Sequence, residues 1–219
     1  MCLWYYSIIL QKAFTIACSP VFLYLVSMKL TNYHTHCYLD DGSQPMEEYV
    51  SKAVDLGFAA LGFSCHTPVP YDDDWHLPED HLQEYLNEVD RLKQFYRDRI
   101  EIYKGLELDY AEDRNILLGE AYRDQLDYVI ASLHMFRDAA GEGYLSFDGP
   151  EEELKQLLST NFGGDGRRMA EAYYRSLSEM MEHHRFDILG HIDLIKKRNR
   201  GGRYFDEQQQ WYRHAVMEA

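Results

Sequence analysis

The chain has 219 residues, 46% of them hydrophobic, which is enough apolar material for one core and favours a single domain over two. Its 22 lysines and arginines stand against 37 aspartates and glutamates, giving a formal net charge of -15. Such a charge repels phosphate backbones, so the composition argues against nucleic acid as a partner. A small phosphorylated substrate is still compatible with it, because bound cations reverse the sign of the local field.

Residues 1–27 differ from the rest of the chain, because Lys12 is their only charged residue and apolar side chains dominate. The segment lacks the basic start of a signal peptide, and Pro20 interrupts a membrane-spanning helix. We interpret it as an upstream extension of the reading frame with Met28 as the natural start, with a signal, an anchor or a structural helix as alternatives. We therefore expect a folded cytoplasmic domain over residues 28–219, with no membrane contact unless residues 1–27 form an anchor.

From Met28 onward, short apolar runs alternate with amphipathic stretches, a pattern typical of βα units in a barrel or a parallel sheet. Strands are expected at residues 29–33, 58–63, 100–104, 128–132 and 186–189. Helices are expected between Pro45 and Gly57, over residues 82–96, around residues 117–122, over residues 169–180 and from near Asp206. This order of elements predicts an α/β fold.

The four cysteines, Cys2, Cys18, Cys37 and Cys65, include no C-x-x-C pair. Neither a disulfide framework nor a zinc ribbon is indicated, and a reducing cytosol fits this usage best. Cys37 and Cys65 neighbour histidines, yet we interpret them as small buried thiols rather than as metal ligands.

Histidines and one glutamate follow the expected strands. They are His34 and His36 after the first strand, His66 after the second, Glu107 after the third, His134 after the fourth and His191 after the fifth. In (β/α) barrels the carboxyl ends of the strands converge, so we expect these side chains to point into one cavity. An isolated H-x-H pair is usually an exposed polar pair, whereas the full set of six residues predicts a metal centre.

Five ordered segments resemble the successive motifs of histidinol phosphatases of the PHP (polymerase and histidinol phosphatase) family. They are NYHTH at 32–36, GFSCHTP at 62–68, GLELDY at 105–110, ASLH at 131–134 and GHIDLIKK at 190–197. The resemblance covers residues 28–219. It implies a distorted (β/α)7 barrel that holds two or three zinc, manganese or iron ions and hydrolyses L-histidinol phosphate to L-histidinol in histidine biosynthesis.

The same resemblance implies a role for each predicted ligand. It assigns His34 and His36 to a first ion, Glu107 to a bridge between the first and second ions, His134 and His191 to the second, and Asp41 and His66 to a third. Asp40 is the alternative to Asp41, because the sequence does not fix the length of their loop. Closely spaced cations would activate a water and hold the phosphate, so no protein nucleophile is required.

Substrate-binding groups are less well marked. Within the basic run at 196–198 we favour Lys197 as a phosphate ligand, although such a run is often a solvated helix start, and Arg137 is a weaker candidate. Asp193 is as compatible with a surface role as with orienting His191. The remaining histidines are expected at the surface: His76, His81, His183, His184 and His214.

One family motif is missing from this sequence. A final D-x-H motif, which supplies the first and third ions with one ligand each in the family, does not occur after His191, and the last barrel strands are expected to be absent with it. We therefore expect this chain to bind metal yet hydrolyse histidinol phosphate poorly, because a misplaced ion slows the reaction. The alternatives are a metal-binding module without catalysis and a nuclease; the net charge argues against the nuclease.

Overall fold

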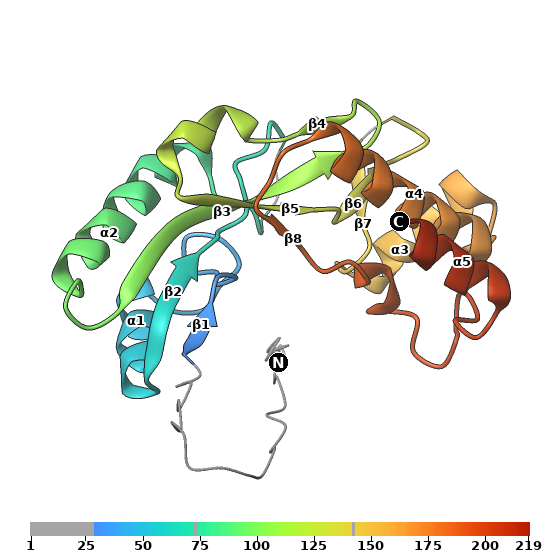
Figure 1. The fold of residues 1–219 in the computed structure, drawn as a ribbon. Helices are drawn as coiled ribbons and strands as arrows, with labels where there is room; N and C mark the ends of the chain where they lie inside the picture. The colour runs from blue at the N-terminus through green and yellow to red at the C-terminus, as the bar shows by residue number, and fades with distance from the viewer. Residues whose placement is uncertain (1–28, 72–73, 142) are drawn as a thin grey trace, which may run out of the picture.

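A curved sheet forms the centre of the computed structural model, which describes residues 29–71, 74–141 and 143–219 (Figure 1). Its parallel strands lie in the order β1 (Leu30–Asn32), β2 (Phe58–Phe63), β3 (Glu101–Ala111), β5 (Tyr128–Ser132) and β8 (Ile188–Leu189). The short strand β4 (Ile116–Leu117) pairs antiparallel with β3. This open, curled sheet confirms the predicted α/β class and has the form of part of a barrel wall.

Helices cover the sheet in two groups. The first group is α1 (Met46–Asp55) and α2 (Leu82–Phe95), which pack on β2 and β3. The second group, at the other end of the sheet in Figure 1, is α3 (Glu151–Phe162), α4 (Gly166–His183) and α5 (Gln210–Glu218). A hairpin of β6 (Met135–Arg137) and β7 (Tyr144–Ser146) contacts α3. The described part of the chain also contains three short 3-10 helices: η1 (Glu79–His81), η2 (Glu120–Gln125) and η3 (Leu194–Lys196).

Local sequence explains where these helices begin and which face they bury. Asp165 caps the start of helix α4, because its carboxylate accepts hydrogen bonds from the backbone N–H groups of Arg167 and Arg168. Its buried residues recur at helical spacing and include Met169, Tyr173 and Met180, so one apolar stripe faces the core.

Several predicted elements need correction. Strands 58–63 and 128–132 have the predicted bounds, but β3 continues to Ala111 because residues 105–111 are all buried, so Glu107 lies within the strand rather than after it. The helix expected around residues 117–122 is instead strand β4 followed by η2, because Gly119 takes a left-handed φ of 81° that ends regular structure. Helix α3 and the β6–β7 hairpin were not predicted.

The predicted boundary at Met28 falls outside the described residues, as do residues 1–27, so that boundary stays a prediction. Within the ranges that the structure describes, none of the helices is both long enough and apolar enough to span a membrane.

Tyr128 fills the inside of the sheet between β2, β3 and β5. Its ring lies against Gly62 and Gly105, where an added Cβ would collide with it. Its hydroxyl donates toward the carbonyl oxygens of Tyr33, at 2.7 Å, and Phe63, at 2.9 Å. Because Tyr33 directly precedes the first predicted ligand, this contact fixes the end of β1 against β2 and β5.

We expect Tyr128→Phe to lower the free energy of unfolding by about 1–3 kcal/mol, because it leaves buried carbonyl groups without their donor. The matched control is Tyr103→Phe, whose hydroxyl binds the exposed Glu101 instead. This control should change stability by no more than about 0.5 kcal/mol. Urea unfolding of both variants measures the difference, and equal losses would show that the Tyr128 hydroxyl has no special role.

Candidate metal centre

The carboxylate of Glu107 is completely buried, and imidazoles surround it. Around Oε2 lie Nε2 of His34 at 2.9 Å, Nε2 of His36 at 3.2 Å and Nδ1 of His66 at 3.6 Å. These three histidines come from the loops that follow β1 and β2, whereas Glu107 points inward from β3. Parallel strands in neighbouring positions therefore bring together residues that are up to 73 positions apart in the chain.

The other oxygen of Glu107 faces a second pair of histidines. Nε2 of His191 lies 3.1 Å and Nε2 of His134 lies 3.4 Å from Oε1, and these two nitrogens are 3.0 Å apart. Ser132 donates its hydroxyl hydrogen to the same oxygen. A Cβ at position 190 would collide with the Ser132 hydroxyl, so Gly190 leaves room for this contact.

The carboxylate of Glu107 stays ionised although it is buried, because of the groups around it. Burial raises the pKa of this carboxyl, but the charges of His134 and His34 and the hydrogen bond with His134 together hold the pKa well below its usual range. Burial, followed by the nearby charge of His36, lowers the pKa of His66 to about 3, so this imidazole is neutral. Within the described residues, its buried Nδ1 has no hydrogen-bond partner, which leaves a lone pair available for a cation.

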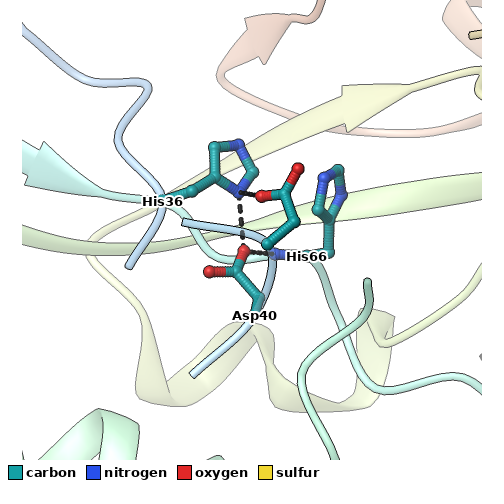
Figure 2. Close-up of side chains that lie close together, drawn as sticks. His36, Asp40 and His66 are labelled. Carbon is teal, nitrogen blue, oxygen red and sulfur yellow. Dashed lines mark hydrogen bonds and ion pairs between the residues drawn. The ribbon is translucent and has the colours of Figure 1, made fainter. Parts of the chain in front are cut away.

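Asp40 orients the imidazole of His36 (Figure 2). Its Oδ2 lies 2.6 Å from Nδ1 of His36 and accepts the backbone N–H of His66 at 3.0 Å. Its Oδ1 accepts the backbone N–H of Cys37 and the thiol of Cys65. Burial raises the pKa of Asp40, but the hydrogen bond and charge of His36 lower it to about 2. Since Nδ1 of His36 holds its proton toward Asp40, Nε2 is the nitrogen that can bind a metal.

Asp41 lies at the rim of the same cluster. Its side chain is 50% exposed, and its Oδ1 is 3.4 Å from Nδ1 of His36. Donor atoms of His36, Asp40, Asp41 and His66 all lie within 4.8 Å of one another, so both aspartates are within reach of one cation. The contacts of Asp40 with four donors favour it as an orienting group, which leaves Asp41 as the predicted ligand.

A second buried carboxylate, Asp109, was missed in the sequence. Its Oδ1 lies 2.5 Å from Nδ1 of His134, and its Oδ2 lies 2.8 Å from Nε2 of His76. Burial raises the pKa of Asp109, but His134 and His76 hold the pKa well below its usual range. The sequence could have indicated this residue. Asp109 follows Glu107 by two residues, so both side chains face the same side of the strand.

His76 was predicted at the surface, and this prediction is wrong. The side chain is buried against Asp109, and its ring lies 5.6 Å from that of His66. It belongs to a long loop between β2 and η1, and hydrophobic periodicity does not indicate where such a loop folds.

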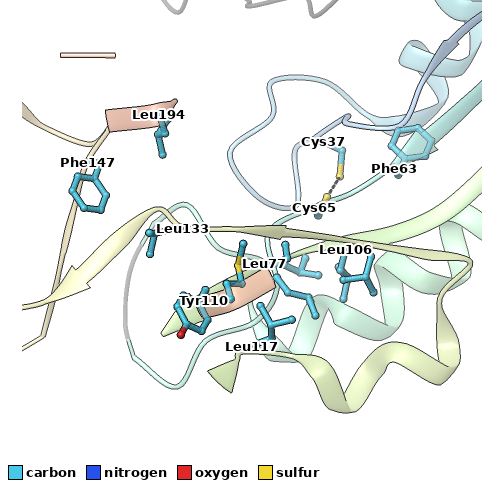
Figure 3. Close-up of a cluster of buried hydrophobic side chains, with 14 of the residues drawn as sticks. Cys37, Phe63, Cys65, Leu77, Leu106, Tyr110, Leu117, Leu133, Phe147 and Leu194 are labelled. Carbon is cyan, nitrogen blue, oxygen red and sulfur yellow. Dashed lines mark hydrogen bonds between the residues drawn. The ribbon is translucent and has the colours of Figure 1, made fainter. Parts of the chain in front are cut away.

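Cys37 and Cys65 are both fully buried, as expected for small core thiols. Their sulfur atoms lie 3.3 Å apart, at the edge of the apolar cluster that contains Phe63 and Leu106 (Figure 3).

The two predicted phosphate ligands already have partners. Nζ of Lys197 lies 3.0 Å from Oδ2 of Asp148, and the guanidinium of Arg137 lies 5.2 Å from the centre of the Tyr144 ring. Burial raises the pKa of Asp148, but His134 and Lys197 lower it. Lys197 is therefore held by Asp148, while its predicted role with phosphate stays a prediction.

The geometry therefore gathers His34, His36, His66, Glu107, His134 and His191 around one carboxylate, with Asp41 beside them. Two further donor sets within 4.8 Å each include Glu107: one with His34 and His191, the other with His66 and His134. A carboxylate shared by two sets is suited to bridging two ions. Imidazole and carboxylate donors together suit zinc, manganese and iron.

Comparison with known proteins agrees with this architecture. A model of the PHP domain matches residues 31–218. Histidinol-phosphatase of Bacillus subtilis is 30% identical over 178 residues, which cover 75% of this chain and 65% of that enzyme. Histidinol-phosphatase of Lactococcus lactis is 26% identical over 176 residues, covering 78% of this chain and 59% of the relative. This chain thus spans less than two thirds of the length of both relatives.

Solved structures share the fold. The crystal structure of hisK from Listeria monocytogenes superposes with a TM-score of 0.69 at 24% identity, covering 86% of this chain and 75% of the other. Histidinol phosphate phosphatase from Lactococcus lactis, solved with zinc, L-histidinol and phosphate, gives a TM-score of 0.55 at 20% identity, covering 77% and 60%. The PHP domain model matches residues 31–218, which is most of the sequence. The chain therefore belongs to the PHP domain family.

Proposed function

We propose that this protein is a metal-dependent phosphomonoester hydrolase whose substrate is L-histidinol phosphate. The observation that carries the proposal is the convergence of five imidazoles on the buried, ionised carboxylate of Glu107. The names of the Bacillus subtilis and Lactococcus lactis relatives support this substrate. The zinc, L-histidinol and phosphate in the Lactococcus lactis structure support the cofactor.

The residues fit two or three divalent ions. His34 and His36 would hold the first ion, Glu107 would bridge it to the second, His134 and His191 would complete the second, and Asp41 and His66 would hold the third. The free lone pair on buried Nδ1 of His66 supports this fit. When bound, such ions neutralise phosphate charge and lower the pKa of a coordinated water toward neutrality.

The protein's own contribution is to fix protons and orientations. Nδ1 of His36 and Nδ1 of His134 hold protons toward Asp40 and Asp109, which turns both Nε2 atoms toward the centre of the cluster. Glu107 stays ionised among them and supplies the negative charge that offsets closely spaced cations. Lys197, beside Asp148, is the cation we propose for the phosphate, and Arg137 is a second candidate.

The net charge of -15 supports a small phosphorylated substrate over nucleic acid, and it is compatible with a cytoplasmic enzyme.

Phosphate release from L-histidinol phosphate by the metal-loaded protein tests the proposal. We expect its kcat/KM to exceed that for glycerol phosphate by at least ~10-fold, because the site must recognise the organic part of the substrate. Chelation should abolish both activities. Tight metal binding without hydrolysis of either ester would instead indicate a metal-binding module, and cleavage of single-stranded DNA would indicate a nuclease.

Glu107→Gln is expected to lose more bound metal than His66→Ala, because the carboxylate serves two ions and offsets their repulsion, whereas His66 would serve one. Elemental analysis of both purified variants gives the ratio of metal to protein. Equal losses would argue against the bridging role of Glu107.

Binding of zinc to the metal-free protein should release protons at pH 7. Burial lowers the pKa values of His36 and His134, but their carboxylate partners, Asp40 and Asp109 with Glu107, raise both pKa values well above normal. Both imidazoles therefore carry a second proton that a metal must displace, so about two protons leave and affinity rises with pH through the neutral range.

Calorimetric titration in two buffers of different ionisation enthalpy counts these protons. His36→Gln should release about one proton fewer than the parent protein, because one of the two protonated imidazoles is gone. An identical heat in both buffers would contradict the prediction.

A further inference from the structure

Asp109 holds two histidines at once, and only one of them belongs to the predicted ligand set. Its two oxygens are divided between Nδ1 of His134 and Nε2 of His76. An ionised carboxylate only accepts hydrogen bonds, so both nitrogens donate to it. All three side chains are buried, with exposed fractions of 1% for Asp109, 2% for His76 and 3% for His134.

The loop that carries His76 is attached to the site at three further points. Leu77 donates its backbone N–H to the carbonyl oxygen of His66 at 3.3 Å. The ring of Trp75 lies 3.6 Å from that of His76 and meets the ring of His66 edge-on at 4.7 Å. The same indole lies 5.5 Å from the ring of His134. This short segment therefore packs on two predicted ligands as well as on Asp109.

We propose that His76 and Asp109 are positioning residues for the metal centre: through their shared hydrogen bonds, the loop residue His76 sets the affinity of the ion held by His134. The inference rests on the metal centre of the proposed function. It adds to that function a coupling between a loop and one ion, carried by a residue outside the predicted ligand set.

The physical reason lies in the two oxygens of Asp109. With both oxygens bound, the carboxylate cannot rotate, so the ring of His134 keeps Nε2 toward Glu107 and His191. Without His76, one oxygen of a buried carboxylate loses its donor, and the group relieves this by rotating. This rotation weakens its hold on Nδ1 of His134. Partners of metal-bound histidines typically contribute about 10–100-fold in metal affinity.

Zinc titrations of the full chain against a competing chelator test the inference. We expect His76→Leu to lower the affinity for one of the bound zinc ions by about 10-fold, and Asp109→Asn to lower it by about 10–100-fold. His76→Gln should stay within about 3-fold of the parent protein, because its amide N–H can replace the Nε2–H donor. The matched control is His81→Gln, an exposed histidine in η1, which should not change the affinity.

A double-mutant cycle separates positioning from general stability. If His76 acts through His134, then His76→Leu should have no further effect on zinc affinity in a His134→Ala background. A purely structural role would instead weaken binding equally in both backgrounds, and that result would overturn the inference. Equal affinities of His76→Leu and His81→Gln would also overturn it.

The parent protein distinguishes this inference from the proposed function. If the parent binds no zinc, the proposed function is wrong, and the inference that rests on it is wrong as well. If the parent binds zinc and only the His76 comparison gives no effect, the proposed function stands and the positioning role is wrong. Should His76→Leu not fold, as judged by circular dichroism, His76→Ala and His76→Gln provide the same comparison, with rescue by glutamine as the decisive result.

Discussion

The burial of one negative charge organises this protein. A carboxylate taken out of water is costly unless charges and hydrogen bonds compensate it, and Glu107 is fully buried. Five imidazoles and the hydroxyl of Ser132 supply that compensation. Burial alone would lower the pKa values of His36 and His134, but Asp40 and Asp109 respectively, each together with Glu107, raise them. Cations would replace those protons, so the electrostatic arrangement that stabilises Glu107 also prepares the site for metal.

Two further carboxylates make this arrangement specific. Asp40, in the loop after β1, and Asp109, on β3, each accept a hydrogen bond from Nδ1 of one inward-facing histidine. Each also accepts a hydrogen bond from another part of the chain: Asp40 from the segment after β2, and Asp109 from the loop that carries His76. The orientation of the imidazoles therefore depends on loops and strands together, which explains why a metal centre of this kind needs a folded sheet behind it.

Sequence patterns located most of the site but missed parts of its support. Residue type and position after apolar runs were enough to predict that His34, His36, His66, His134 and His191 would lie together, and their role as metal ligands stays a prediction. The end of β3 was misjudged because a buried strand with both faces covered shows no alternation, so Glu107 appeared to follow the strand. His76 was misjudged because its burial results from contacts with Asp109 and Trp75 rather than from any local pattern.

The sequence by itself therefore determined the α/β class, the family and the set of candidate ligands, because hydrophobic periodicity and short motifs are local properties. Tertiary structure alone decided which oxygen of Glu107 each imidazole faces, that Asp40 orients His36, and that Lys197 pairs with Asp148. These outcomes depend on distances between strands and loops far apart in the chain. Such distances follow from sheet register and from the packing of buried polar groups, which no stretch of neighbouring residues encodes.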